Sequence, residues 1–173
     1  DQVAQILWLA RIRMVIGEIP VHFAEKLDHL ATNGAQDVRR RCPGHAIAKG
    51  AFLLLAADYR IGVDGPFNIC LNEVQIGMTM HHAGIELARD RLRKSAFHRS
   101  VINAEPFTPQ GAVDAGFLDK VVAAEDLHAT ALATAQQMKK LNMVAHRNTK
   151  LKVRKGLLEA LDKAIELDSA AGM

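Results

Sequence analysis

The sequence predicts a mixed domain, α/β or α+β, whose C-terminal part is a layer of helices. Strand-like apolar segments come early in the chain, helical patterns dominate its end, and no internal repeat or low-complexity linker separates a second domain. The 173 residues are 49% hydrophobic and 24% charged, which is the composition of one globular domain large enough to bury a core.

The N-terminal part predicts one strand and one helix. Residues 3–9 are β-like, and residues 20–31 carry apolar side chains at helical spacing until Asn33-Gly34 ends the pattern. Residues 37–41 then begin like a strand, which breaks off into Cys42-Pro43-Gly44.

Residues 42–77 contain the most informative pattern of the chain. A turn of small residues leads into an apolar helix, and a short strand, a Gly65-Pro66 turn and a second strand lead to Glu73. The first amides of a helix lack intrahelical acceptors, and the helix dipole favours negative charge beside them. Residues 44–51 could therefore stabilise an oxygen that gains charge, while Glu73 moves a proton nearby.

Each half of this pattern also has a purely structural interpretation. Residues 44–51 could form a tight strand-to-helix turn with glycine for packing, and Glu73 could be a solvated loop carboxylate. A phosphate loop of the Walker type is excluded, because the lysine precedes the glycine and no serine or threonine follows it.

The rest of the chain predicts mainly helices. Thr108 is a good N-cap with Pro109 in the first turn, and Gly116 is placed to end that helix in a left-handed conformation. The further expected elements are helices at 82–93, 95–102, 127–141 and 145–167, and a strand at 117–122.

The charge pattern gives only weak information about partners. The net charge is +3, and basic residues cluster at 39–41, 89–94 and 147–155. These clusters either form solvated helix faces or attract an anionic ligand such as a nucleotide phosphate. Nucleic acid is not expected, because aromatic residues are 5% of the chain and no binding motif is present.

Hydropathy predicts no membrane contact. The apolar runs are too short to cross a bilayer, and the chain starts at Asp1 without a secretory leader, so we expect an intracellular, cytoplasmic protein.

No metal or cofactor site is expected. His81 and His82 are adjacent and cannot face one point from a helix, and neither cysteine nor carboxylate stands at ligand spacing. Cys42 and Cys70 are expected to be buried free thiols, and His45 a core or surface histidine.

Three segments resemble the enoyl-CoA hydratase/isomerase (crotonase) superfamily. They are GHAIAKGAFLLLAADYRI, FNICLNEVQIG and NAEPFTPQGAVDAGFLDKVV, which together run through residues 44–122, whereas residues 3–38 match more weakly. The resemblance implies a crotonase-like (ββα) spiral core in residues 1–122. It also implies that residues 123–173 form the helical trimerisation layer of the same domain, in a homotrimer or a dimer of trimers.

The family's functional positions can be carried over to this sequence. Its second oxyanion-hole donor falls on the backbone N–H of Lys49, where many members have glycine, and the next glycine is kept as Gly50. The first glutamate of the hydratases is replaced by Phe52, and their second falls on Glu73. The context of Glu73 is closest to the Δ3,Δ2-enoyl-CoA isomerases, which work with that single acid.

The resemblance therefore implies an acyl-CoA enzyme of fatty acid metabolism that shifts a double bond, with the CoA thioester as substrate and no separate cofactor. The alternatives are an enoyl-CoA hydratase, which is a lyase, and a non-catalytic CoA-ester-binding member of the fold. The expected substrate contacts are His45, Ala46, Ile47, Gly50, Phe52, Met78 and His81, with Lys150 on a CoA phosphate. His81 stands where dienoyl-CoA isomerases have another carboxylate.

One family segment has no counterpart in this sequence. The family has a long stretch between the equivalents of Val38 and Cys42, with an Ala/Ser-Gly-x-Asp turn that supplies the first oxyanion donor. We expect this segment to be missing between Arg41 and Cys42, because residues 39–41 look cut in mid-strand.

Overall fold

The computed structural model describes residues 39–171. The strand expected at 3–9 and the helix expected at 20–31 lie outside the described residues. The described part divides into two compact units, a larger one with residues 39–80 and 84–141 and a smaller one with residues 81–83 and 142–171.

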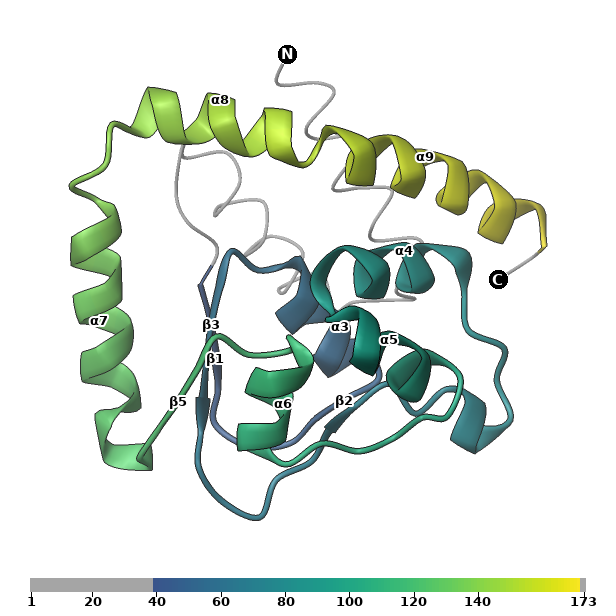
Figure 1. The fold of residues 1–173 in the computed structure, drawn as a ribbon, viewed down its shortest axis with the longest axis horizontal. Coiled ribbons are helices and arrows are strands. Elements are labelled where there is room, and N and C mark those ends of the chain that lie inside the picture. Colours follow the sequence, from purple (N-terminus) through teal and green to yellow (C-terminus); the bar gives the residue numbers. More distant parts are fainter. Residues whose placement is uncertain (1–38, 172–173) are drawn as a thin grey trace. The chain divides into compact units, whose positions relative to one another are not determined.

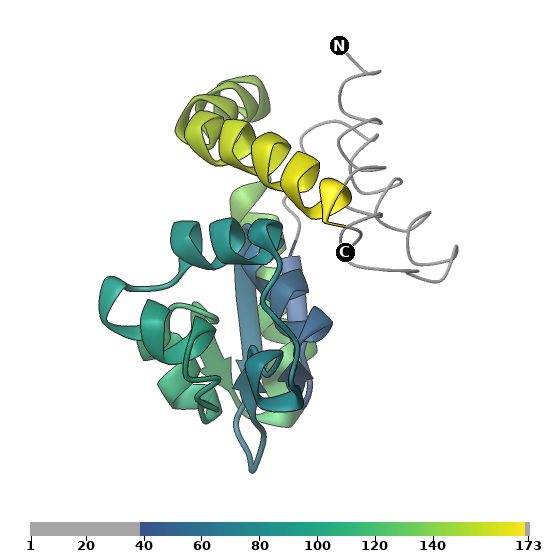
Figure 2. The same ribbon diagram turned by 90° about the vertical axis from the view of Figure 1, so that its right-hand side faces the viewer.

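A three-stranded parallel sheet forms the centre of the larger unit. Its strands are β1 (Arg39–Cys42), β3 (Tyr59–Val63) and β5 (Lys120–Val122), with β3 in the middle (Figures 1 and 2). The junction between Arg41 and Cys42 lies inside β1, where these residues pair with Ile61 and Gly62 in unbroken register. The strands expected at 37–41 and 117–122 are thus confirmed as β1 and β5, while residues 37 and 38 lie outside the described residues.

Helices cover both faces of this sheet. Helix α7 (Leu127–Met138) lies on one side, and α3 (Lys49–Ala56) and α6 (Pro109–Ala115) lie on the other (Figure 1). The remaining elements of the larger unit are β2 (Ala46–Ile47), β4 (Ile69–Cys70), η1 (Val74–Ile76), α5 (Lys94–Val101) and η2 (Ala124–Asp126). Helix α4 (His82–Arg91) begins in the smaller unit and continues into the larger one.

The face of the sheet toward α7 is apolar. Side chains alternate along a strand, so Ile61 and Val63 share this face, where both are buried against Leu127 of α7. The partly buried residues packed around them are Tyr59, Phe67, Val122 and Ala131. The short strand expected before the Gly65-Pro66 turn is therefore present as β3.

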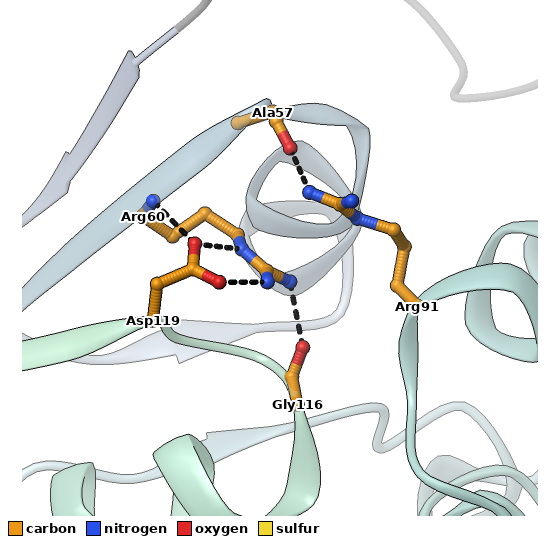
Figure 3. A network of polar contacts seen from close by, with 5 residues as sticks. All are labelled: Ala57, Arg60, Arg91, Gly116 and Asp119. Atoms are coloured by element: carbon orange, nitrogen blue, oxygen red, sulfur yellow. Dashed lines mark hydrogen bonds and ion pairs between the residues drawn. The ribbon is translucent and has the colours of Figure 1, made fainter. Parts of the chain in front are cut away.

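The opposite face carries a buried arginine. The Arg60 guanidinium lies between the Asp119 carboxylate and the Gly116 carbonyl at the end of α6, and Arg91 donates to the Ala57 carbonyl at the end of α3 (Figure 3). The Arg60 contacts attach the end of α6 to the sheet, whereas the Arg91 contact joins α4 to the end of α3.

Helix α6 has the ends that were expected. The Thr108 side chain accepts a hydrogen bond from the Gly111 amide, Pro109 is in the first turn, and Gly116 has a left-handed φ of 100°. The helices expected at 82–93, 95–102 and 127–141 are also present, with slightly different ends.

The smaller unit contains two helices, α8 (Met143–Val153) and α9 (Lys155–Ala170). The prediction of one continuous helix over residues 145–167 is wrong, because the chain leaves helical geometry at Arg154, with ψ near 3°. Gly156 follows two residues later, and its low helix propensity is the only local signal of a break. Within this unit, the buried Asp168 carboxylate accepts from the amides of His82 and Ala83, at 2.8 and 3.0 Å.

Within residues 39–171, none of the helices has the length and apolar composition that a membrane span requires.

Candidate active site

Two short parallel strands bring the two halves of the candidate site together. In the β2–β4 pair, Ile47 lies opposite Cys70, and the Ala48 amide donates to the Cys70 carbonyl at 3.0 Å. After β2 the chain enters α3 at Lys49, and three residues after the end of β4 it reaches Glu73. The carboxyl ends of paired parallel strands share one edge, which is where open α/β sheets bind ligands.

The start of α3 offers backbone donors at this edge. The amides of Ala51 and Phe52 donate to the Ala48 carbonyl, whereas those of Lys49 and Gly50 have no acceptor within residues 39–171. No side chain caps the helix, and its first turn contains no acidic residue. These free amides, with the positive end of the helix dipole, can therefore accept a negatively charged oxygen.

Ala48 holds these donors in an unusual conformation. Its φ is 49° and its ψ is −117°, a region that residues other than glycine rarely adopt. Such a backbone costs about 1–3 kcal/mol and persists only where the surrounding structure imposes it, often at functional sites. Here the bond from the Ala48 amide to the Cys70 carbonyl is one such constraint.

Glu73 is a buried acid, and one of its carboxyl oxygens is unpartnered among the described residues. Its exposed fraction is 6%, and its Oε2 atom has no hydrogen-bond partner among the described residues. Burial raises the pKa of the Glu73 carboxyl, although a hydrogen bond from its own backbone amide acts in the opposite direction. A carboxyl with a raised pKa is better suited than an ordinary glutamate to take up and release a proton during a reaction.

The Glu73 carboxylate is close to the end of β4. Burial raises the pKa of the Cys70 thiol, and the negative charge of Glu73 raises it further. Cys42 is also buried, and its thiol donates to the Gly44 carbonyl at 3.1 Å. Both cysteines are free and buried, as expected, and these raised pKa values make them poor nucleophiles.

The expected substrate contacts around α3 differ in exposure. His45 is exposed, its Nδ1 accepts from the Asn68 amide at 3.0 Å, and its ring meets Phe67 edge-on. Ala46 and Phe52 are buried, at 5% and 1% exposure, so they support the site from within. The apolar side chains of Ile47 and Met78 are exposed, at 42% and 57%.

Two expected contacts belong to the smaller unit. His81 and Lys150 are partly buried there, and their roles at the site stay predictions. Across the described range, no group of three or more histidine, cysteine or acidic side chains is arranged to hold a metal ion.

Some features of the site could not be foreseen. The strained backbone of Ala48 has no sequence signal, because alanine normally avoids positive φ. The Asn72 Oδ1 is a second buried acceptor without a partner among the described residues, directly before Glu73. The only sequence signal for Asn72 is its position between β4 and Glu73.

Comparison with known proteins identifies the family. Residues 38–171 match the family model "Enoyl-CoA hydratase/isomerase". The chain belongs to this family. The likeness to solved structures confirms the crotonase fold, with a TM-score of 0.76 to an enoyl-CoA hydratase/isomerase family protein from Pseudomonas syringae that is 74% identical. That match covers 78% of this chain and 58% of the other.

The names of further relatives include both activities. Human mitochondrial enoyl-CoA delta isomerase 1 is 32% identical over 136 residues, which cover 76% of this chain and 40% of the relative. An enoyl-CoA hydratase from Mycobacterium marinum is 38% identical with a TM-score of 0.71, and the match covers 75% and 57% of the two chains. The chain thus spans less than two thirds of the length of each of these relatives.

Proposed function

We propose that the chain carries the acid/base residue and one oxyanion donor of an enoyl-CoA isomerase. The observation that carries this proposal is Glu73, which is buried, has an unpartnered oxygen among the described residues, and follows the strand paired with the entry to α3. Free amides and a protonatable carboxyl at one edge suit an enolate intermediate.

The reaction would run in two proton transfers. The thioester oxygen of a 3-enoyl-CoA accepts a hydrogen bond from the Lys49 amide, and Glu73 removes a proton from carbon 2. The electrons move onto the thioester oxygen, where the amide stabilises the enolate; one such donor typically contributes about 3 kcal/mol. Glu73 then returns the proton to carbon 4, which leaves the double bond between carbons 2 and 3.

The first oxyanion donor of the family is part of this proposal. It would come from the Ala/Ser-Gly-x-Asp turn that we expect to be missing between Arg41 and Cys42. Among residues 39–171, the amides at the start of α3 are the donors that we assign to the site.

Hydration is a weaker alternative, because it needs a second group to hold and activate water. The position of the first hydratase glutamate is Phe52, which is 1% exposed and offers no acid or base. A non-catalytic role is also disfavoured, since a carboxylate kept only for solubility would face water, whereas Glu73 is buried.

The test is the Glu73→Gln variant. Its turnover of a trans-3-enoyl-CoA, followed by the ultraviolet absorbance of the conjugated product, should fall by about a thousandfold, because a general acid/base contributes 10²–10⁴-fold. Binding of a saturated acyl-CoA should persist. The control is Glu125→Gln, an exposed carboxylate in η2 that should retain turnover. Unchanged isomerisation by Glu73→Gln would refute the assignment.

The proposed assembly is a homotrimer or a dimer of trimers. The large apolar side chains exposed on α8 and α9 are Val144, Leu151, Val153 and Leu167. Faces of this kind are usually covered by a partner. Sedimentation of the full chain tests this, and a monomer at micromolar concentration would contradict it.

A cytoplasmic location and a contact between Lys150 and a CoA phosphate belong to the same proposal. For Lys150, charge reversal (Lys150→Glu) should weaken acyl-CoA binding, and unaltered affinity would argue against the contact.

A further inference from the structure

Two buried acceptor atoms lie on successive residues of the candidate site. Asn72 Oδ1 and Glu73 Oε2 have no hydrogen-bond partner among the described residues, although both atoms are buried. Most buried polar atoms in proteins are hydrogen-bonded, so two neighbouring exceptions need an explanation. The proposed isomerase reaction uses the Glu73 carboxyl but assigns no role to Asn72.

The backbone holds both residues in place. The Asn72 carbonyl accepts from the Ile76 amide at 3.1 Å, and the Glu73 carbonyl accepts from the amides of Ile76 and Met78, at 3.2 and 2.9 Å. The Cα atoms of successive residues are about 3.8 Å apart, so the two side chains start from neighbouring, fixed points. Because Glu73 is only 6% exposed, bulk solvent does not supply the missing donor.

A single proton can satisfy both atoms. A carboxylate oxygen and an amide oxygen are both acceptors and cannot hydrogen-bond to each other, whereas a protonated carboxyl has an O–H donor. A hydrogen bond from the Glu73 O–H group to Asn72 Oδ1 gives each atom its partner. This bond exists only while Glu73 carries the proton.

We propose that Asn72 is a positioning residue for the acid: when Glu73 is protonated, its Oε2–H group donates a hydrogen bond to Asn72 Oδ1. The catalytic meaning of this inference rests on the proposed isomerase function. In the first step the C–H bond at carbon 2 breaks and the proton moves to Glu73, where Asn72 holds it. In the second step this hydrogen bond breaks as the proton moves to carbon 4. Asn72 thereby stabilises the protonated acid between the two transfers.

The other titratable groups at this edge are Cys70, His45 and Lys49. The Cys70 thiol is in electrostatic contact with Glu73 and stays neutral, because burial and the Glu73 charge raise its pKa. His45, before the paired strand β2, and Lys49, at the start of α3, are exposed. None of the three side chains donates to either unpartnered oxygen.

The test follows the acidic limb of kcat/KM for a trans-3-enoyl-CoA in Asn72→Leu, which has a similar shape but no acceptor. Loss of a hydrogen bond that only the protonated acid makes lowers the pKa of Glu73. The limb should therefore move by about one pH unit toward acid. Asn72→Ser has a shorter side chain that does not reach the same point, so it should move the limb in the same direction without overpacking the site.

A second measurement does not depend on catalysis. The unfolding free energy should fall as pH rises from the unfolded pKa of a glutamate to the raised folded pKa of Glu73, because the folded protein holds the proton more tightly. In Asn72→Leu the folded pKa is lower, so this fall should end about one pH unit earlier. Denaturant titrations at several pH values measure it.

The matched control is Asn103→Leu. Asn103 undergoes the same substitution but is exposed and follows the end of α5. Its variant should keep the wild-type acidic limb and the wild-type pH dependence of stability.

Two results would overturn the proposal. One is an unchanged limb and an unchanged pH dependence of stability in both Asn72 variants. The other is a move of both toward higher pH, because Asn72 would then donate to the ionised carboxylate through its Nδ2 group. If the wild type does not turn over a trans-3-enoyl-CoA but Asn72→Leu still ends the fall in stability earlier, the isomerase function fails and the hydrogen bond stands.

Discussion

Arg60 and Asp119 are joined by backbone and side chain at once. Arg60 Nε donates to Oδ2 of Asp119 at 2.8 Å and Nη2 to Oδ1 at 2.6 Å, while the Arg60 amide also donates to Oδ2. The Asp119 amide in turn donates to the Arg60 carbonyl at 2.9 Å. Because Arg60 Nη1 also donates to the Gly116 carbonyl, one side chain fixes β3, the approach to β5 and the end of α6.

Breaking this pair should destabilise the fold. The Arg60 side chain is 6% exposed and that of Asp119 is 29% exposed, so Asp119→Ala leaves a buried guanidinium without its counter-charge. Loss of one partner of a buried pair costs about 3 kcal/mol. Urea denaturation should show this as a lower midpoint.

The control for this prediction is a more exposed ion pair. In the Arg99–Glu105 pair the side chains are 52% and 36% exposed, and solvent screens such pairs. Glu105→Ala should shift the midpoint much less than Asp119→Ala. Equal shifts would mean that the geometry around Arg60 contributes nothing beyond an ordinary surface contact.

Gly116 should not tolerate a side chain. Its φ is 100°, and an added Cβ would lie 2.7 Å from the Arg91 carbonyl oxygen and 3.2 Å from the Leu92 Cα, which are backbone atoms that cannot move aside alone. Gly116→Ala should therefore cost about 2–3 kcal/mol of unfolding free energy.

Gly156 is the matched comparison for Gly116. It lies in the first turn of α9, where an added Cβ meets nothing within 4 Å. Gly156→Ala should raise stability by about 1 kcal/mol, the difference in helix propensity. Thermal unfolding of the two variants should thus shift in opposite directions, and a loss at both positions would contradict the argument.

Local signals explain what the sequence could predict. Thr108, Pro109 and Gly116 act within one helix, and the alternation in β3 needs only neighbouring residues, so both are visible in the sequence. The position of Glu73 after a strand was also visible. Its burial depends on how other segments pack around it, which no local pattern describes.

The features that were not predicted differ in cause. The two residues of β2 pair with β4, and the bond to Cys70 is one constraint on the conformation of Ala48. The break at Arg154 has no proline and no glycine at the break itself. For β2 and Ala48 the partner strand lies more than twenty residues away in the sequence, and nothing in the structure explains the break at Arg154.

Relieving the strain at Ala48 should stabilise the protein. Glycine adopts a positive φ at no steric cost, but it also increases the conformational entropy of the unfolded chain. Because relief of the strain is the larger effect, Ala48→Gly should raise the unfolding free energy by about 1 kcal/mol. The comparison is Ala56→Gly in α3, which should lower it by a similar amount. If both variants lose stability equally, the backbone at Ala48 is not strained in solution.

The pH dependence of turnover should reflect Glu73. The carboxylate must be ionised to remove a proton from substrate, and burial raises its pKa above the ordinary value of a glutamate. The acidic limb of kcat/KM should therefore lie above the pH at which an ordinary glutamate ionises. Stopped assays across mildly acidic and neutral pH measure this, and a limb at or below the ordinary value would contradict it.

The same proton should also affect stability. Since the pKa of Glu73 is raised in the folded state, the folded protein binds this proton more tightly than the unfolded chain. Unfolding free energy must then decrease as pH rises from the unfolded pKa through the raised folded pKa. Glu73→Gln removes this titration, so its stability relative to wild type should increase with pH across that window and become constant above it.

A second non-ionising variant separates charge from hydrogen bonding at this position. Glu73→Met and Glu73→Gln differ in polarity, so their absolute stabilities should differ, yet both lack the proton and should share the same altered pH dependence. Denaturant titrations at several pH values provide the comparison. If only one variant changed the slope, the wild-type pH dependence would come from a rearrangement around Glu73, because ionisation is absent from both variants.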